Sequence, residues 1–247
     1  MKKRYNIDEQ EIKCRRKGSS VAMSAIPRQV RAVRGAHLQL KRQWEQVRPV
    51  LEQRLLAFRK LWKSGSETEF FSELAFCLFT PQSKAQSCWA TVECLRNKSL
   101  LFGGTQQQVS KELNRVRFRY NKAHYLLEAR KVFAAGDKLS VRTKLSSFPD
   151  EFSAREWIVQ NIKGLGYKEA THFLRNIGAS RELAILDRHI LRRLCALRVI
   201  KEIPSTLSRA VYLDVEKKMQ RFARKCAIPM EHLDLLFWYM ATGEVFK

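Results

Sequence analysis

A chain of 247 residues with 45% hydrophobic and 10% aromatic residues can bury a sizeable core, which excludes a disordered protein and suits one large domain or two small lobes. Its 47 lysines and arginines outnumber its 24 acidic residues, and the net charge of +23 far exceeds what solubility requires. Such an excess indicates a polyanionic partner, most often nucleic acid and less often an anionic membrane surface. The alternative is a merely basic protein with solvated faces.

The six cysteines and the N-terminus argue against a metalloprotein, a secreted protein and a membrane protein. No two cysteines form a C-x-x-C pair, and they do not cluster as iron–sulfur ligands do. Several have apolar neighbours and are expected to be reduced core residues of a cytosolic protein. The N-terminus lacks the apolar segment of a signal peptide, and no apolar run approaches the length that spans a membrane.

The first part of the chain changes from polar to amphipathic. Residues 1–35 are polar and basic, and Gly-Ser-Ser at 18–20 interrupts any helical pattern, so we expect a disordered basic extension that touches phosphates non-specifically. From about Leu38 to Trp62 the apolar residues follow 3.6-residue spacing. This spacing predicts an amphipathic helix with a kink or break at Pro49.

The next segment is apolar nearly all round and predicts a central buried helix. Residues 66–69 begin it, and Phe70–Phe79 supply the apolar run. Pro81 marks its end, and Ser83 is expected to cap the following helix, which we place at residues 84–95.

A basic region with interleaved aromatic residues follows a loop expected at 101–104. One continuous helix is expected from about Val109 to Leu127. The basic residues of this region are Arg115, Arg117, Arg119, Lys122, Arg130 and Lys131. Mixing of basic and aromatic side chains suits phosphate contacts beside base stacking. A helix with a solvated basic face is the alternative.

The remaining segments are also helical in pattern. Residues 153–156 match a capping box at the start of a helix whose apolar stripe includes Trp157, Ile158 and Ile162. Further helices are expected at residues 188–197, 208–225 and 231–240. No stretch alternates strongly with period two, so the expected fold class is all-α, without an internal repeat.

Two glycines one residue apart, Gly164 and Gly166, lie between two of these helical segments. Glycine permits positive φ, and amides at the start of a helix lie beside the positive end of its dipole, which favours a bound phosphate. We therefore predict a DNA-binding hairpin whose second helix ends at Gly178; an ordinary helix–turn–helix corner is the alternative. The residues expected to contact DNA are Lys163, Gly164, Leu165, Gly166 and, beyond the hairpin, His189.

Lys168 and Asp187 are the candidate reactive groups. Lys168 lies in the first turn of the second hairpin helix, where the dipole disfavours positive charge. A lysine attacks only when neutral, and burial with positive surroundings lowers the pKa of such a group; phosphate binding is the alternative role. Asp187 follows 19 residues later as the N-cap of another helix. A fixed carboxylate can stabilise an oxocarbenium-like transition state, although capping alone would also explain it. His172 and His189 are expected to pack or to contact phosphate.

Four segments of the chain together resemble the helix-hairpin-helix DNA glycosylase superfamily. They are the hairpin with Lys168 (162–178), the Asp187 segment (186–190), residues 79–85 and residues 235–243. Within it, the chain is most similar to the lysine-bearing 8-oxoguanine DNA glycosylases of archaeal type, over about residues 38–247. The iron–sulfur cysteines of the endonuclease III branch are absent, which argues against that branch.

The resemblance implies a two-lobed, all-helical glycosylase domain over residues 36–247, with a DNA-binding cleft between the lobes into which the damaged guanine is flipped. It implies that Lys168 attacks C1′ of the sugar and displaces the base, and that β-elimination from the Schiff base then cuts the strand on the 3′ side. Asp187 would stabilise the transition state and assist proton transfers. Trp238 and Lys247 would form the base pocket, so a C-terminal tag is expected to reduce excision. Weaker assignments to base or DNA contacts are Gln82, Lys84 and Phe118.

We accordingly expect a DNA repair enzyme that acts as a monomer on double-stranded DNA containing 8-oxoguanine. It is expected in the cytoplasm with the nucleoid, away from membranes, and without a metal or other cofactor. Two alternatives remain open at this stage. A non-catalytic helix-hairpin-helix module would explain the charge and the glycines, but it requires neither Lys168 nor Asp187. A glycosylase for oxidised pyrimidines or mismatched bases would require both.

Overall fold

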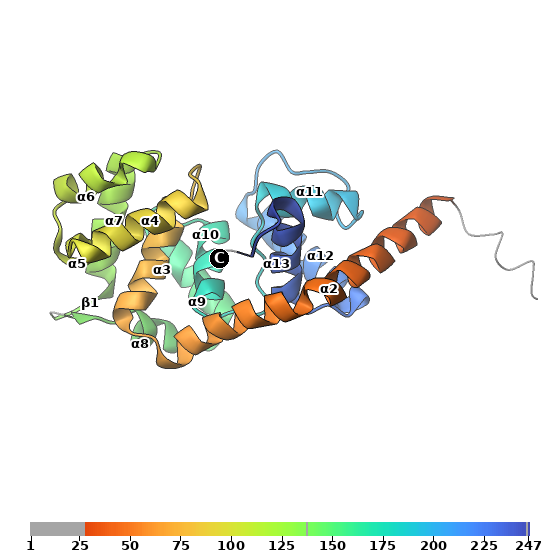
Figure 1. Ribbon diagram of the computed structural model, residues 1–247, viewed down its shortest axis with the longest axis horizontal. Coiled ribbons are helices and arrows are strands. Elements are labelled where there is room, and N and C mark those ends of the chain that lie inside the picture. The colour runs from red at the N-terminus through yellow and green to blue at the C-terminus, as the bar shows by residue number, and fades with distance from the viewer. Residues whose placement is uncertain (1–27, 137, 246) are drawn as a thin grey trace, which may run out of the picture.

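The computed structural model describes residues 28–136, 138–245 and 247, and nearly all of its regular structure is helical (Figure 1). The helices are α2 (Arg28–Ser64), α3 (Glu67–Phe79), α4 (Ala85–Asn97), α5 (Leu100–Gly103), α6 (Gln106–Glu112), the 3₁₀ helix η1 (Leu113–Arg115), α7 (Arg119–Phe133), α8 (Val141–Ser146), α9 (Glu151–Asn161), α10 (Tyr167–Asn176), α11 (Arg188–Ala196), α12 (Arg209–Cys226) and α13 (Met230–Thr242). A short antiparallel pair, β1 (Ala134–Ala135) and β2 (Lys138–Leu139), is the exception. The all-α prediction is confirmed.

The buried apolar residues form two clusters, one for each lobe. The first cluster lies between Phe70 and Leu183 and is built by α3 to α10. The second combines the part of α2 up to Phe58 with residues from Ala184 to Phe237 on α11, α12 and α13. The lobes lie side by side in Figure 1, and α2 runs along both. The two-lobed architecture follows from this division of the core.

Helix α2 differs from its prediction at two places. It continues through Pro49, where a kink or break was expected, so the break is wrong; residues on both sides of the proline, such as Trp44 and Leu51, bury in the same second cluster. It also begins at Arg28, so residues 28–35 are helical although they fall within the expected extension. Residues 1–27, the rest of that expected extension, lie outside the described residues.

Helix α3 is the central helix of the first lobe, as predicted. All residues from Phe70 to Phe79 are buried, and α3 packs on α4, α7, α8 and α10. The Ser66 hydroxyl accepts the N–H of Glu69, and the Glu69 carboxylate accepts the N–H of Ser66. This capping box fixes where the helix begins.

Two predicted caps are wrong. Ser83 does not cap α4, which begins without a side-chain cap; its hydroxyl accepts the backbone N–H of Arg117 at 3.0 Å instead. The capping box expected at 153–156 is absent, because Asp150 begins α9 earlier by accepting the N–H of Ser153 at 2.7 Å. Aspartate caps a helix about as well as serine, so cap propensity alone does not distinguish Asp150 from Ser153.

The continuous helix expected from residue 109 to residue 127 is also wrong. The chain forms α6, then η1, then a turn at 116–118 in which Phe118 has φ 60, before α7 begins. The loop expected at 101–104 is wrong as well, because residues 101–103 belong to the short helix α5. Within the described ranges, no helix has the length and apolar character needed to cross a membrane.

Candidate active site

The hairpin joins α9 to α10 over residues 162–166, as the glycine pattern predicted. Ile162 and Leu165 are buried and anchor it to the first lobe. Gly164 has φ 93, and a Cβ there would lie 2.4 Å from Cδ2 of Tyr125 on α7. Both the backbone conformation and the close approach of Tyr125 therefore require glycine at 164. Lys163 is exposed, with its Nζ 5.8 Å from the centre of the Tyr125 ring.

Lys168 and Asp187 line one pocket of about 500 Å³ although they belong to different lobes. Lys168 lies in the first turn of α10, and its Nζ is 3.4 Å from Oε1 of Glu169. Asp187 is the N-cap of α11, and its Oδ1 accepts the N–H of Ile190 at 2.8 Å. The fold thus brings together the two residues that the sequence singled out, in a space large enough for a flipped base.

Three further residues predicted for base recognition also line this pocket, namely Lys84, Trp238 and Lys247. The ring of Trp238 meets His189 edge to face, with 5.3 Å between centroids. Gln82 and Phe118 do not line the pocket; both are exposed and have positive φ. His189 and the hairpin residues 163–166 likewise lie outside it.

Lys247 is anchored in the junction between the lobes, where Figure 1 places the end of the chain near α10 and α13. Its ammonium donates to the Glu73 carboxylate and lies 3.2 Å from the centroid of the Trp89 ring. Burial lowers the pKa of Lys247, while Glu73 acts in the opposite direction. Asn176 of α10 donates to the same carboxylate at 3.0 Å, so Glu73 ties the tail to two helices of the first lobe.

The pocket also contains buried charged residues that the sequence analysis did not assign to it. Arg175 and Asp234 both line it, with 3.8 Å between Nη2 and Oδ2. Burial raises the pKa of Asp234 to about 6; Arg175 lowers it and Asp187 raises it further. Asp234 is the one acidic residue in the otherwise apolar run 233–237, and this pattern could have identified it as a candidate site residue. His172 lines the pocket too, and burial lowers its pKa well below the ordinary value.

Two of the basic residues expected to contact phosphate instead bond to the protein's own backbone: Lys122 is buried and Arg130 is half-buried. Lys122 is buried, and its Nζ donates to the carbonyls of Phe79 and Pro81 at 2.7 Å each; burial lowers its pKa to about 8. Arg130 donates to three carbonyls at the ends of α5, including that of Leu101 at 2.9 Å. The other basic residues of that region, Arg115, Arg117, Arg119 and Lys131, are exposed.

No group of three or more histidine, cysteine or acidic side chains is arranged to hold a metal ion in the part of the chain that the structure describes. The described cysteines are free thiols, and Cys77 and Cys88 are buried. Burial raises the pKa of the Cys88 thiol to about 11.

Comparisons with known proteins agree with this architecture. Residues 51–228 match the family described as 8-oxoguanine DNA glycosylase. A protein of Fusobacterium nucleatum named 8-oxoguanine DNA glycosylase/AP lyase is 42% identical over 196 residues, which cover 79% of this chain and 90% of that protein. The crystal structure of the 8-oxoguanine DNA glycosylase of Thermotoga maritima matches with a TM-score of 0.76 and 31% identity, over 87% of this chain and 100% of that chain.

A second solved structure contains DNA. It is the 8-oxoguanine glycosylase/lyase of Methanocaldococcus jannaschii in complex with a 15mer containing 8-oxoguanine; its TM-score is 0.76, its identity 33%, and the match covers 85% of this chain and 100% of that chain. A family match over most of the chain, together with relatives of this identity and coverage, establishes the family. The chain belongs to the 8-oxoguanine DNA glycosylases.

Proposed function

We propose that this chain is a bifunctional DNA repair enzyme, which removes 8-oxoguanine from double-stranded DNA and then cuts the strand on the 3′ side of the lesion. The observation that carries the proposal is the meeting of Lys168 and Asp187 in one pocket between the lobes. A module that only grips DNA needs the hairpin but has no use for a lysine and an aspartate that line one cavity. The relatives that match over most of the chain are named for both activities.

In the proposed chemistry, the neutral Nζ of Lys168 attacks C1′ of the flipped nucleotide. The bond from C1′ to the base breaks, the electron pair leaves with the base, and the base takes up a proton. The carboxylate of Asp187 stabilises the positive charge that develops on the sugar. Loss of a proton from the amine and opening of the sugar ring give a Schiff base. Removal of a C2′ proton then breaks the C3′–O bond and cuts the strand.

The hairpin and the turn at 116–118 are proposed to contact the DNA whose flipped base enters the pocket. Lys163 and the glycine-rich backbone suit phosphate contacts, because no side-chain cap occupies the start of α10. Phe118 is 53% exposed, and the Arg117 guanidinium lies 5.6 Å from its ring centroid. An exposed aromatic ring beside an arginine suits stacking on bases. Trp238, Lys84 and Lys247 are proposed to contact the base.

We further propose that the enzyme acts as a monomer, with the nucleoid in the cytoplasm and without a membrane. Both proposed reactive groups and the pocket lining come from one chain, so a second copy is not needed to complete the site. Light scattering of the free protein and of its complex with a lesion duplex tests the monomer: one chain per duplex is expected.

The experiment that tests the function combines borohydride trapping with a panel of lesion duplexes. Wild-type protein is expected to form a covalent adduct with 8-oxoguanine DNA, and Lys168→Gln to form none. Lys111→Gln, which changes an exposed lysine on α6, is the matched control and should trap as the wild type does. Absence of any wild-type adduct would favour the non-catalytic module. An adduct only with oxidised pyrimidines or mismatches would indicate a glycosylase for another base.

A further inference from the structure

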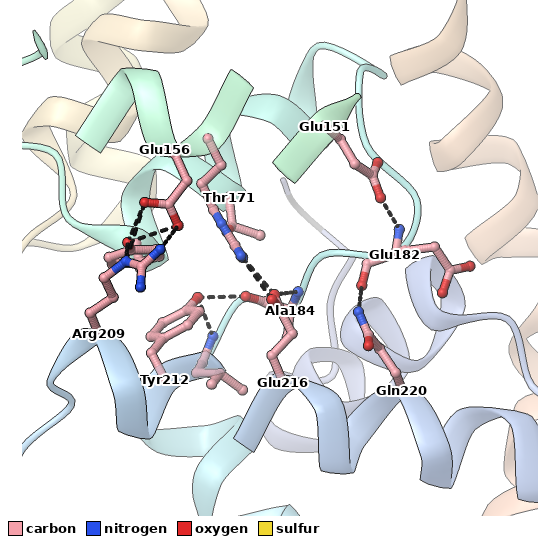
Figure 2. A network of polar contacts seen from close by, with 12 residues as sticks. Glu151, Glu156, Thr171, Glu182, Ala184, Arg209, Tyr212, Glu216 and Gln220 are labelled. Atoms are coloured by element: carbon pink, nitrogen blue, oxygen red, sulfur yellow. Dashed lines mark hydrogen bonds and ion pairs between the residues drawn. The ribbon is translucent and has the colours of Figure 1, made fainter. Parts of the chain in front are cut away.

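The two proposed reactive groups belong to different lobes, so their separation depends on how the lobes are fixed to each other. Lys168 is on α10 of the first lobe, and Asp187 begins α11 of the second. Buried polar contacts join α9 of the first lobe to α12 of the second (Figure 2). We call Arg155, Tyr212 and Glu216 the interlobe latch.

The carboxylate of Glu216 is the centre of the latch. Its Oε1 and Oε2 accept from Nη1 and Nη2 of Arg155 at 2.6 and 2.8 Å, and the two side chains are 1% and 3% exposed. Oε1 also accepts the backbone N–H of Ala184 at 2.8 Å. One carboxylate therefore holds α9, α12 and the segment that leads to Asp187.

Tyr212 holds the same segment closer to Asp187. Its hydroxyl donates to the carbonyl of Ala184 at 2.5 Å and accepts the N–H of Leu186 at 3.3 Å. Leu186 immediately precedes Asp187. Burial raises the pKa of Tyr212, which keeps the hydroxyl protonated and able to donate. The Tyr212 hydroxyl thus bonds two backbone groups just before Asp187, the carbonyl of Ala184 and the N–H of Leu186, to α12.

The latch also contacts the helix that carries Lys168. The guanidinium of Arg155 lies 5.3 Å from the ring centroid of Tyr167, the residue before Lys168, and 5.7 Å from that of Tyr212. Nη1 of Arg155 donates to Oγ1 of Thr171, one turn along α10, at 3.3 Å. The same guanidinium therefore touches the Lys168 helix and, through Glu216, the Asp187 segment.

We propose that the interlobe latch is a set of positioning residues, which fixes the Lys168 amine relative to the Asp187 carboxylate for the reaction; this inference rests on the proposed function. None of the three latch residues lines the pocket, so each acts through the backbone it holds. Displacing reacting groups by about 1 Å can cost about 100-fold in rate, so a loosened latch should slow chemistry without weakening DNA binding. A latch that only held the lobes together would affect stability and leave the rate of the folded enzyme unchanged.

Tyr212→Phe is the decisive variant, because it removes the two hydrogen bonds to residues 184 and 186 and keeps the ring packed. At a temperature where the variant is folded by circular dichroism, single-turnover excision and borohydride trapping on 8-oxoguanine DNA are expected to slow by about 10-fold or more. The Kd for the same duplex should stay within about 2-fold of the wild-type value, because Tyr212 is buried and does not reach the surface.

Gln220→Met is the matched control. Gln220 lies on the same helix and donates to the carbonyl of Glu182, in the same segment but further from Asp187, at 2.8 Å. The control should excise at the wild-type rate. If Tyr212→Phe does not fold, Thr171→Val takes its place, because it removes the hydrogen bond between Arg155 and α10; a slowed rate with unchanged Kd supports the latch.

Wild-type protein measured in the same assay distinguishes a failure of the latch proposal from a failure of the proposed function. An active wild type with Tyr212→Phe, or its substitute Thr171→Val, at the same rate overturns the latch alone. Equal slowing of Tyr212→Phe and Gln220→Met also overturns it, since the effect would then not depend on the contact with residues 184 and 186. A wild type that excises no base overturns the proposed function itself.

Discussion

Two polar regions at the junction between the lobes are built on opposite principles. In the interlobe latch, Glu216 meets Arg155 at hydrogen-bond distance with both oxygens. In the pocket, Arg175 and Asp234 are buried but 3.8 Å apart, and burial raises the pKa of Asp234 to about 6. Buried polar groups that lack close partners are costly and are concentrated at functional sites. The difference indicates that the latch fixes geometry and that the pocket keeps polar groups available for a substrate.

The largest expected effect comes from removing the Asp187 charge while keeping its cap. Asparagine caps helices about as well as aspartate, so Asp187→Asn should retain the bond from the N–H of Ile190 and change the unfolding free energy by about 0.5 kcal/mol or less. The loss of the carboxylate should lower single-turnover excision by about 1,000-fold, equivalent to about 4 kcal/mol. Excision assays and urea unfolding of the same preparation measure both.

Asp150→Asn is the control for that comparison, because Asp150 is the N-cap of α9 and lies outside the pocket. It should leave excision unchanged. Wild-type excision by Asp187→Asn would mean that this aspartate only caps α11, the alternative that the sequence left open.

The largest stability effect is expected at the latch. Arg155→Met leaves the Glu216 carboxylate buried without its charged partner, and breaking such a pair costs about 3–5 kcal/mol. The double variant Arg155→Met with Glu216→Leu should be more stable than Arg155→Met, because no uncompensated charge remains. Urea unfolding of the two variants gives the comparison. A loss of less than about 1 kcal/mol in Arg155→Met would show that the ion pair does not hold the lobes.

Local patterns predicted the parts of the site that depend on neighbouring residues. The glycine spacing located the hairpin, and the position of Asp187 before a helical pattern located an N-cap, which the bond to Ile190 bears out. The segment that is apolar nearly all round also predicted the buried character of α3. Each of these features is determined by side chains within a few residues of one another, so a single sequence contains the information.

Contacts between distant residues were not predictable in this way. Lys122 carries the same charge as its exposed neighbours, and the carbonyl of Phe79 that it bonds is 43 residues away. Arg155 and Glu216 are separated by 61 residues. Two candidate caps, Asp150 and Ser153, lie close together, and the sequence offers no reason to prefer one. The latch and the internal lysine required the tertiary structure for these reasons.

The hairpin offers a smaller and more local test. Gly164→Ala should destabilise the protein by about 1–3 kcal/mol, because alanine disfavours the φ of 93° and its Cβ would collide with Tyr125. Gly166→Ala is the matched control: φ is −89° there, and the Cβ would lie 3.4 Å from Oε2 of Glu169. Thermal unfolding and DNA binding should both change less in the control. Equal effects of the two substitutions would contradict the special role of position 164.

The smallest effect is expected from His172, and it depends on pH. Burial lowers the pKa of His172 well below 6.5 in the folded protein, so the imidazole is neutral there while the unfolded chain takes up a proton as the pH falls through 6.5. The stability that the neutral histidine contributes is therefore present above that pH and lost below it, by about 1.4 kcal/mol at pH 5.5. Asp234 changes stability with pH in the opposite direction. Between its unfolded pKa and about 6, the folded state binds the extra proton, so the contribution of Asp234 to stability falls as the pH rises.

The contribution of His172 is best isolated by comparing wild type with His172→Phe. The unfolding free energy of each is measured in urea at pH 7.5 and 5.5, and the difference in pH dependence between the two proteins is the contribution of His172. Phe76→Leu, which alters the ring that meets His172 edge to face, should instead lower stability by similar amounts at both pH values. A pH dependence unchanged by His172→Phe would show that this imidazole is not held neutral in the pocket.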